Sequence, residues 1–102
     1  AHAESASVQE AACGALRNLS SNDENSTRAG AAGAVEAVAS AMRAHAESAG
    51  VQEAACRALR NLTHNDAENR TRAGTAGAVE AVAAAMRAHT GSAGVQVAAC
   101  FA

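Results

Sequence analysis

The chain has 102 residues, a formal net charge of −2 and a single aromatic residue, Phe101. This length predicts one small domain or part of a larger one, and the charge balance offers no basic stripe of the kind that binds nucleic acid. No run of about 18 apolar residues is free of charge, so the sequence predicts no membrane span.

The first predicted element is a long helix. An apolar stripe at steps of four, four and three residues predicts it, and the stripe consists of Val8, Ala12, Leu16 and Leu19. The stretch SVQE matches a capping box, in which a serine oxygen accepts a backbone N–H at the start of a helix. We therefore expect Ser7 to cap this helix.

A short polar helix is predicted next, from Asn22 or Asp23 to about Ala32, because Asn and Asp are good N-caps. Gly33 then breaks the chain and permits a sharp turn. The following stretch AVEAVASAMRAH predicts a middle helix whose apolar face consists of Val35, Val38 and Met42.

The whole pattern then repeats. VQEAACGALRNLSSND begins at Val8, VQEAACRALRNLTHND begins 43 residues later at Val51, and a third VQ begins 44 residues after that at Val95. We assign the extra residue to Ala67, because NDENSTRAG becomes NDAENRTRAG. The single segment 1–102 therefore divides into a repeat at 1–43, a repeat at 44–87 and a partial repeat at 88–102.

These stretches resemble the armadillo repeat family. AGAVEAVASAMR and AGAVEAVAAAMR are similar to the middle helix of that repeat, and ACGALRNLS and ACRALRNLT are similar to its third helix. HEAT repeats are the nearest alternative, but they usually have two helices and lack the Asn. The resemblance covers essentially the whole chain and implies an all-α fold, a right-handed α-solenoid of armadillo-like three-helix repeats. It implies a protein–protein interaction scaffold and no enzyme.

The Asn of each ALRNL stretch is the best candidate for contact with a partner. Residues four apart on a helix share a face, and this face lies away from the Val–Leu stripe. In armadillo proteins the corresponding surface is the concave groove, where by resemblance the Asn would hold the backbone of an extended peptide. The predicted partner-binding residues of this column are Asn18, Asn61, Glu10, Glu53, Arg57 and Phe101.

Two features of this column leave alternatives open. Family members that grip basic peptides carry Trp one turn before the Asn, where this chain has Gly14, Arg57 and Phe101, so a basic peptide is not expected. Arg57 suits a carboxylate-rich partner, or it simply pairs with Glu53 on a solvated face. The Asn residues equally suit a helix cap or a hydrogen bond between repeats.

No set of residues is spaced for catalysis, and we expect no metal and no cofactor. The three cysteines, Cys13, Cys56 and Cys100, occupy one repeated position rather than a disulfide or zinc pattern. We predict small buried thiols on helices, kept reduced, which favours an intracellular protein with the organelle open.

Two functions remain from this reading. The first is a recognition scaffold, a fragment of a longer chain, whose concave face receives a protein or an extended peptide. The second is an architectural subunit packed in a large assembly without peptide binding. Because a solenoid usually needs about three repeats and end caps, we also expect end-to-end neighbours, or self-association of the isolated chain.

Overall fold

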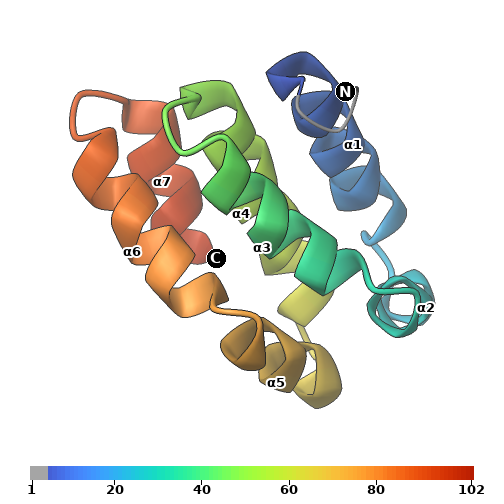
Figure 1. Ribbon diagram of the computed structural model, residues 1–102. Coiled ribbons are helices and arrows are strands. Elements are labelled where there is room, and N and C mark those ends of the chain that lie inside the picture. Colours follow the sequence, from blue (N-terminus) through green and yellow to red (C-terminus); the bar gives the residue numbers. More distant parts are fainter. Residues whose placement is uncertain (1–4) are drawn as a thin grey trace.

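The computed structural model describes residues 5–102 (Figure 1). These residues form seven helices and no strand: α1 (Ala6–Leu19), α2 (Asp23–Ala31), α3 (Ala34–Ala44), α4 (Ala49–Thr63), α5 (Ala67–Thr75), α6 (Ala78–Ala88) and α7 (Ala93–Phe101). The predicted all-α fold and the predicted order of long, short and middle helices are confirmed.

The helices pack in repeated layers. The long helices α1, α4 and α7 lie side by side, with α4 in the middle. The middle helices α3 and α6 form a second row, and the short helices α2 and α5 meet at one edge (Figure 1). Because α4 also contacts α2, α3, α5 and α6, it is the central element of this helical repeat solenoid.

Each long helix begins with a serine at the same place in the repeat. The hydroxyl oxygens of Ser48 and Ser92 accept backbone N–H groups three residues on, both at 3.2 Å, and Ser5 is the N-cap of α1. The prediction of Ser7 as the cap is wrong, because α1 begins at Ala6 and Ser7 lies inside its first turn. Ser5 stands one position before the helix, where its oxygen can reach an N–H that has no partner within the helix.

The short helices also carry side-chain caps, as predicted. Asn22 caps α2 by accepting the N–H of Asn25 at 2.8 Å, and Asp66 caps α5 by accepting the N–H of Asn69 at 2.9 Å. Asn22 and Asp66 are therefore equivalent positions of the repeat.

This equivalence corrects the position of the extra residue. Since Asp66 matches Asn22, the extra residue lies in the loop before Asp66, and the assignment to Ala67 is wrong. Asn65 has a φ of 56°, in the left-handed region that Asn tolerates better than most residues. The insertion lies in the loop between α4 and α5: α5 keeps the nine-residue length of α2, whereas α4 is one residue longer than α1.

The turns before the middle helices depend on glycine. Gly33 and Gly77 precede α3 and α6 with φ values of 91° and 83°, which a residue with a Cβ adopts only with strain. The predicted breaks at these two positions are confirmed.

Burial follows the position of each layer in the stack. The stripe of α4 is fully enclosed and consists of Val51, Ala55, Leu59 and Leu62. The same stripe on α1 lies at one end of the stack, where Leu19 is 58% exposed. On the middle helices, Val35 of α3 is buried, whereas its counterpart Val79 on α6 is 67% exposed. Identical sequence positions are therefore core in the centre and surface at the ends.

Candidate partner-binding surface

The predicted partner-binding residues lie along the three parallel long helices. We call this set the asparagine strip. It consists of Glu10 and Asn18 on α1, Glu53, Arg57 and Asn61 on α4, and Phe101 on α7. We add Val97 of α7, the counterpart of Glu53, which was not among the predicted residues. Since α1 contacts α4 and α4 contacts α7, the strip crosses all three layers of the solenoid.

The two asparagines of the strip differ in their surroundings. The Asn61 amide Nδ2 donates to the backbone carbonyl of Arg17, at 2.7 Å, and so ties α4 to the last turn of α1. Asn18 is exposed, and its side chain makes no hydrogen bond with residues 5–102. Asn61 therefore serves the fold at least in part, whereas the carboxamide of Asn18 is available.

The charged members of the strip form one ion pair within α4 and two close approaches between neighbouring long helices. Arg57 pairs with Glu53 across 3.2 Å on the half-exposed face of α4, an i,i+4 pair that stabilises a helix by about 0.2–0.5 kcal/mol. The Glu53 carboxylate also lies against Gly94 in the first turn of α7, and Glu10 lies in the same way against Gly50 of α4. A helix N-terminus favours negative charge, so each glutamate faces a favourable end of the next long helix.

The strip changes character on α7. Val97 and Phe101 replace the Glu and the Arg or Gly of the earlier layers, and both are well exposed. The guanidinium of Arg60 lies 5.2 Å from the centre of the Phe101 ring, within the range of a cation–π contact. This end of the strip therefore combines apolar surface with cationic groups.

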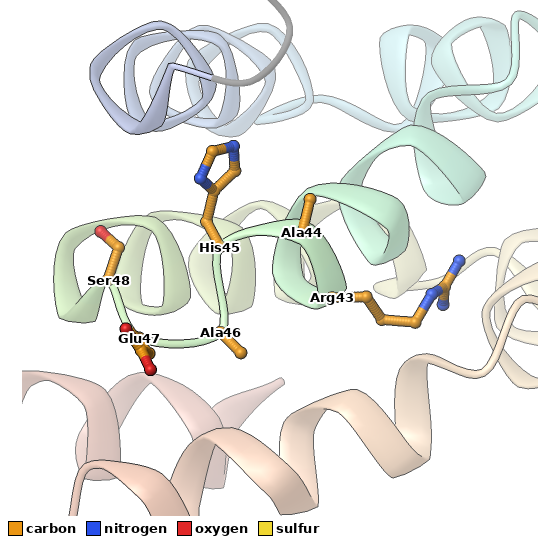
Figure 2. Close-up of a pocket in the computed structure, with 6 residues that line it drawn as sticks. All are labelled: Arg43, Ala44, His45, Ala46, Glu47 and Ser48. Atoms are coloured by element: carbon orange, nitrogen blue, oxygen red, sulfur yellow. The ribbon is translucent and has the colours of Figure 1, made fainter.

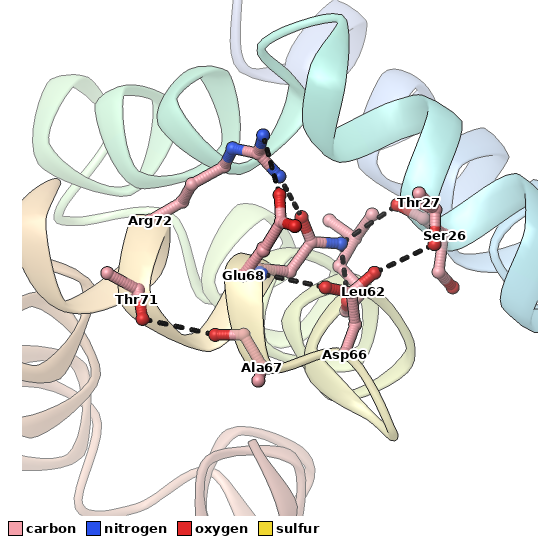
Figure 3. Close-up of polar contacts among 9 residues, drawn as sticks. Ser26, Thr27, Leu62, Asp66, Ala67, Glu68, Thr71 and Arg72 are labelled. Atoms are coloured by element: carbon pink, nitrogen blue, oxygen red, sulfur yellow. Dashed lines mark hydrogen bonds and ion pairs between the residues drawn. The ribbon is translucent and has the colours of Figure 1, made fainter.

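A second cluster of polar contacts lies between the repeats and was not predicted from the sequence. Asn69 of α5 is completely buried, and its Nδ2 donates to the carbonyls of Ser26, at 2.8 Å, and Leu62, at 2.7 Å (Figure 3). Its Oδ1 accepts from Arg72 at 2.9 Å. A Cβ added at Gly30 of α2 would overlap the Asn69 carboxamide, so the glycine makes room for it. The recurrence of Asn25 and Asn69 in the two ENSTRAG-like stretches was the available signal.

Asp66 links the same two helices at the surface. Its carboxylate accepts the Asn69 N–H and also the Thr27 hydroxyl of α2, at 3.0 Å (Figure 3). The backbone hydrogen bond from Asn69, together with the Thr27 hydroxyl and the nearby Arg72 charge, lowers the pKa of Asp66 below its ordinary value.

The loops after the middle helices form another set of repeated contacts. Gln52 is buried and its Nε2 donates to the carbonyls of Met42 and His45, and Gln96 does the same for the end of α6. Each Gln thereby satisfies carbonyls that a helix C-terminus leaves without partners. No role was predicted for these residues from the sequence, although VQ recurs three times.

The loop from Arg43 to Ser48 borders an open hollow (Figure 2). Its side chains point apart: His45 toward α1, and Arg43 toward the start of α6, where its Nη1 donates to the carbonyl of Ala76 at 2.8 Å. These side chains do not converge on one point. The hollow therefore offers no set of groups for catalysis.

The repeated cysteine has a different environment on each long helix. Cys13 and Cys56 are buried, and Cys100 is exposed. Burial, with a smaller effect of the neighbouring Cys13, raises the pKa of Cys56 to about 11, and burial also raises the pKa of Cys13. The prediction of small buried thiols is thus correct for two of the three positions.

Within residues 5–102, no group of three or more His, Cys, Asp or Glu side chains could hold a metal ion. No helix of the described part of the chain is both long and apolar enough to cross a bilayer.

Comparison with known proteins agrees with the geometry. The family model of the LRRK2 ARM repeat matches residues 1–102. No curated protein and no solved structure matches the chain. The repeated long, short and middle helices, the glycine turns and the ALRNL helices thus coincide with an armadillo model that spans the full sequence. The chain belongs to the LRRK2 ARM repeat family.

Proposed function

We propose that this chain is a protein–protein interaction scaffold inside the cell, and that the asparagine strip receives an extended segment of a partner protein. Armadillo repeats form a helical scaffold that acts by binding, and the proposal includes no catalytic step. The free thiols at Cys13 and Cys56 are compatible with a reducing compartment.

The single observation that carries the proposal is the state of Asn18. An exposed carboxamide has one acceptor and two donors, which match the C=O and N–H groups of an extended backbone. Asn18 is not occupied by the fold, whereas Asn61 already donates one hydrogen bond to the Arg17 carbonyl. Asn61 retains its Oδ1 and a second N–H for a partner.

The charges beside the asparagines indicate the chemistry of the segment. Arg17 and Arg60 are exposed, Arg57 is half-exposed, and guanidinium groups bind carboxylates through paired hydrogen bonds. The apolar end at Val97 and Phe101 suits one or two large apolar side chains. We therefore expect an extended segment with acidic residues and an apolar anchor at one end.

The test begins with a random peptide library displayed on phage and selected on the wild-type chain. Selected peptides are then titrated against three variants. We expect Asn18→Ala and Arg57→Ala to weaken binding about tenfold, the loss of roughly one good hydrogen bond or ion pair, while Glu80→Ala on α6 has no effect. Equal effects of all three substitutions, or a selection that yields only basic peptides, would contradict the proposal.

The alternative is an architectural subunit without peptide binding. The Asn61–Arg17 hydrogen bond favours it, because it gives the repeated Asn a role in the fold. Under this alternative no peptide is selected, and Asn61→Ala lowers stability, whereas Asn18→Ala changes nothing.

A further inference from the structure

One contact between α4 and α7 shows which side chains of neighbouring long helices meet on the asparagine strip. The guanidinium of Arg60 on α4 lies 5.2 Å from the ring centre of Phe101 on α7. Arg17 on α1 and Arg57 on α4 hold the equivalent positions, one repeat earlier, where α1 packs on α4. The repeat therefore brings the Arg17 guanidinium toward the side chain of Arg57.

Hydrogen bonds on both sides of this junction support that placement. Asn61 of α4 donates to the carbonyl of Arg17 at 2.7 Å, so the backbone that carries the Arg17 side chain is fixed against α4. The Arg57 guanidinium donates to Glu53 at 3.2 Å, which restrains its orientation. Although α4 has a long helix on each side, the Arg57 side chain remains 35% exposed. This position therefore faces solvent with both neighbouring layers in place.

The positive charge at the junction of α1 and α4 is only partly balanced. Arg57 has Glu53 as its partner, whereas Arg17 is exposed and forms no ion pair with residues 5–102. The other carboxylate of the strip, Glu10, lies about two turns before Arg17 and is directed against Gly50. Two guanidiniums beside one carboxylate leave a net positive charge that suits an anionic partner group.

The same place lacks a side chain on α1. Gly14 is the counterpart of Arg57 and lies three residues before Arg17, so it is a neighbour of Arg17 on the helix surface. A Cβ added at Gly14 would meet no atom within 4 Å, so packing does not require glycine, and an interior glycine destabilises a helix relative to alanine. The bare backbone leaves room beside the two guanidiniums for a group larger than a carboxylate.

We propose that Arg17, Arg57 and Asn61 form a subsite for a phosphorylated serine or threonine of the partner segment, above Gly14. The inference rests on the proposed function, because it assumes that the asparagine strip receives an extended segment. A phosphate monoester carries a charge of about −1.5 to −2 at pH 7 and has three acceptor oxygens. Arg17 and Arg57 supply charge and paired N–H donors, and Asn61 keeps a second N–H that can donate.

The next junction, between α4 and α7, takes a different group. There the guanidinium of Arg60 already lies over the Phe101 ring, and Val97 is exposed on the same helix. This junction suits the apolar anchor of the segment. The segment therefore places its phosphorylated residue over α1 and α4 and its apolar residue over α7, which fixes its direction across the strip.

The first test needs no peptide. A ¹⁵N-labelled full chain, in buffer free of phosphate, is titrated with N-acetyl-O-phosphoserine amide while its NMR chemical shifts are followed. We expect the largest shifts at the backbone amides of Gly14, Arg17 and Arg57 and at the side-chain amide of Asn61. N-acetylserine amide should cause none of these shifts, and N-acetylglutamate amide should bind about tenfold more weakly.

Four variants separate the subsite from general charge. Arg17→Gln and Arg57→Gln should each weaken phosphoserine binding about tenfold, since each removes one set of charged donors. Arg60→Gln is the matched control, because it removes the same charge at the equivalent position of the next layer, and it should bind phosphoserine like the wild type. Gly14→Leu should melt no lower than the wild type and still lose binding, because its side chain fills the space above the α1 backbone.

The second test uses peptides selected on the wild-type chain, with phosphoserine placed at each position in turn. At one position phosphoserine should strengthen binding about tenfold relative to serine, and Arg17→Gln should abolish that gain while Arg60→Gln keeps it. Peptides that bind but gain nothing from phosphoserine at any position would overturn the subsite and leave the proposed function standing.

The titration has its own contrary results. Absent shifts, equal affinities for the phosphoserine and glutamate compounds, or an Arg60→Gln variant as impaired as Arg17→Gln would each contradict the subsite. If phosphoserine binds at the expected residues but no peptide is selected, the subsite is supported and the proposed function fails.

Discussion

Gly30 and Gly74 occupy the same position of the repeat, but only Gly30 has a neighbour above it. The Asn69 carboxamide fills the space beside Gly30, whereas nothing lies within 4 Å of a Cβ at Gly74. In a helix, replacing Gly by Ala normally stabilises by about 0.5–1 kcal/mol, and overpacking normally costs about 1–3 kcal/mol. The two substitutions should therefore have opposite signs.

We expect Gly30→Ala to lower the free energy of unfolding by about 1–3 kcal/mol and Gly74→Ala to raise it by up to about 1 kcal/mol. Urea denaturation followed by circular dichroism, at a protein concentration where the chain is monomeric, measures both. If both substitutions stabilise the chain, then Asn69 has room to move and the close fit at Gly30 is not needed.

Asp66 gives stability a dependence on pH. Its pKa is lower in the folded chain than in the unfolded chain, because the Asn69 N–H and the Thr27 hydroxyl bind the ionised form. A lowered pKa stabilises the fold above the unfolded pKa of about 3.9, and that contribution is lost as the pH falls through the folded pKa. The wild-type chain should therefore lose stability between about pH 5 and pH 3.

The first repeat suggests a control for the pH dependence that Asp66 causes, because the uncharged Asn22 occupies the same cap position there. Asp66→Asn keeps a cap oxygen and cannot titrate, so the variant should lose less stability than the wild type over the same pH range. Thermal melts at each pH measure the difference. Parallel losses in the two proteins would assign the acid sensitivity to other carboxylates.

At the scale of the helix, one repeated cysteine reports how well each long helix is covered. Cys100 on α7 is exposed, while Cys13 and Cys56 are buried, and burial raises the pKa of both, to about 11 for Cys56. Thiols react as thiolates, so the buried pair is protected by both access and protonation. We expect a maleimide to label Cys100 at once and Cys56 only when the chain opens globally.

Mass spectrometry of tryptic peptides over time measures the three rates separately. Cys13 should fall between the others, because α1 is covered on only one side by α4. Equal rates at all three positions would mean that the stack opens as a whole on the labelling timescale.

The helices themselves were predictable because their signals are local. The steps of the apolar stripe, the caps Asn22 and Asp66, and the glycines before α3 and α6 each act within a few residues. The errors were local as well: Ser5 competes with Ser7 as a cap, and a single extra residue can be placed at several points of a loop. The cap hydrogen bond from the Asn69 N–H to Asp66 places the insertion before Asp66, in the loop.

The contacts between repeats were less predictable, because they join residues about 43 positions apart. Nothing in the immediate neighbourhood of Asn69 shows that it enters the space above Gly30, or that Glu53 faces Gly94. The asparagine strip was found through the resemblance, and the roles of Asn18 and Arg57 toward a partner stay predictions. The sequence left open that the repeated Asn forms a hydrogen bond between repeats instead of binding a partner. The hydrogen bond from Asn61 to the Arg17 carbonyl fits that alternative.

At the scale of the whole chain, stability comes from close approach rather than from large side chains. The fully enclosed positions include Ala39, Ala55 and Ala58, so the helices lie near one another at the centre of the stack. Among the long helices of residues 5–102, only α4 is covered on both sides, by α1 and α7. Since each layer stabilises its neighbours, the free energy of opening should fall from the centre to the ends.

Native-state hydrogen exchange tests this gradient directly. The amides of α4 should exchange most slowly, those of α3 faster, and those of α1 and α7 fastest, because the outer helices can open without exposing Val51, Leu59 and Leu62. Uniform protection across all seven helices would instead indicate a single cooperative unit, in which the end layers are as firmly held as the middle one.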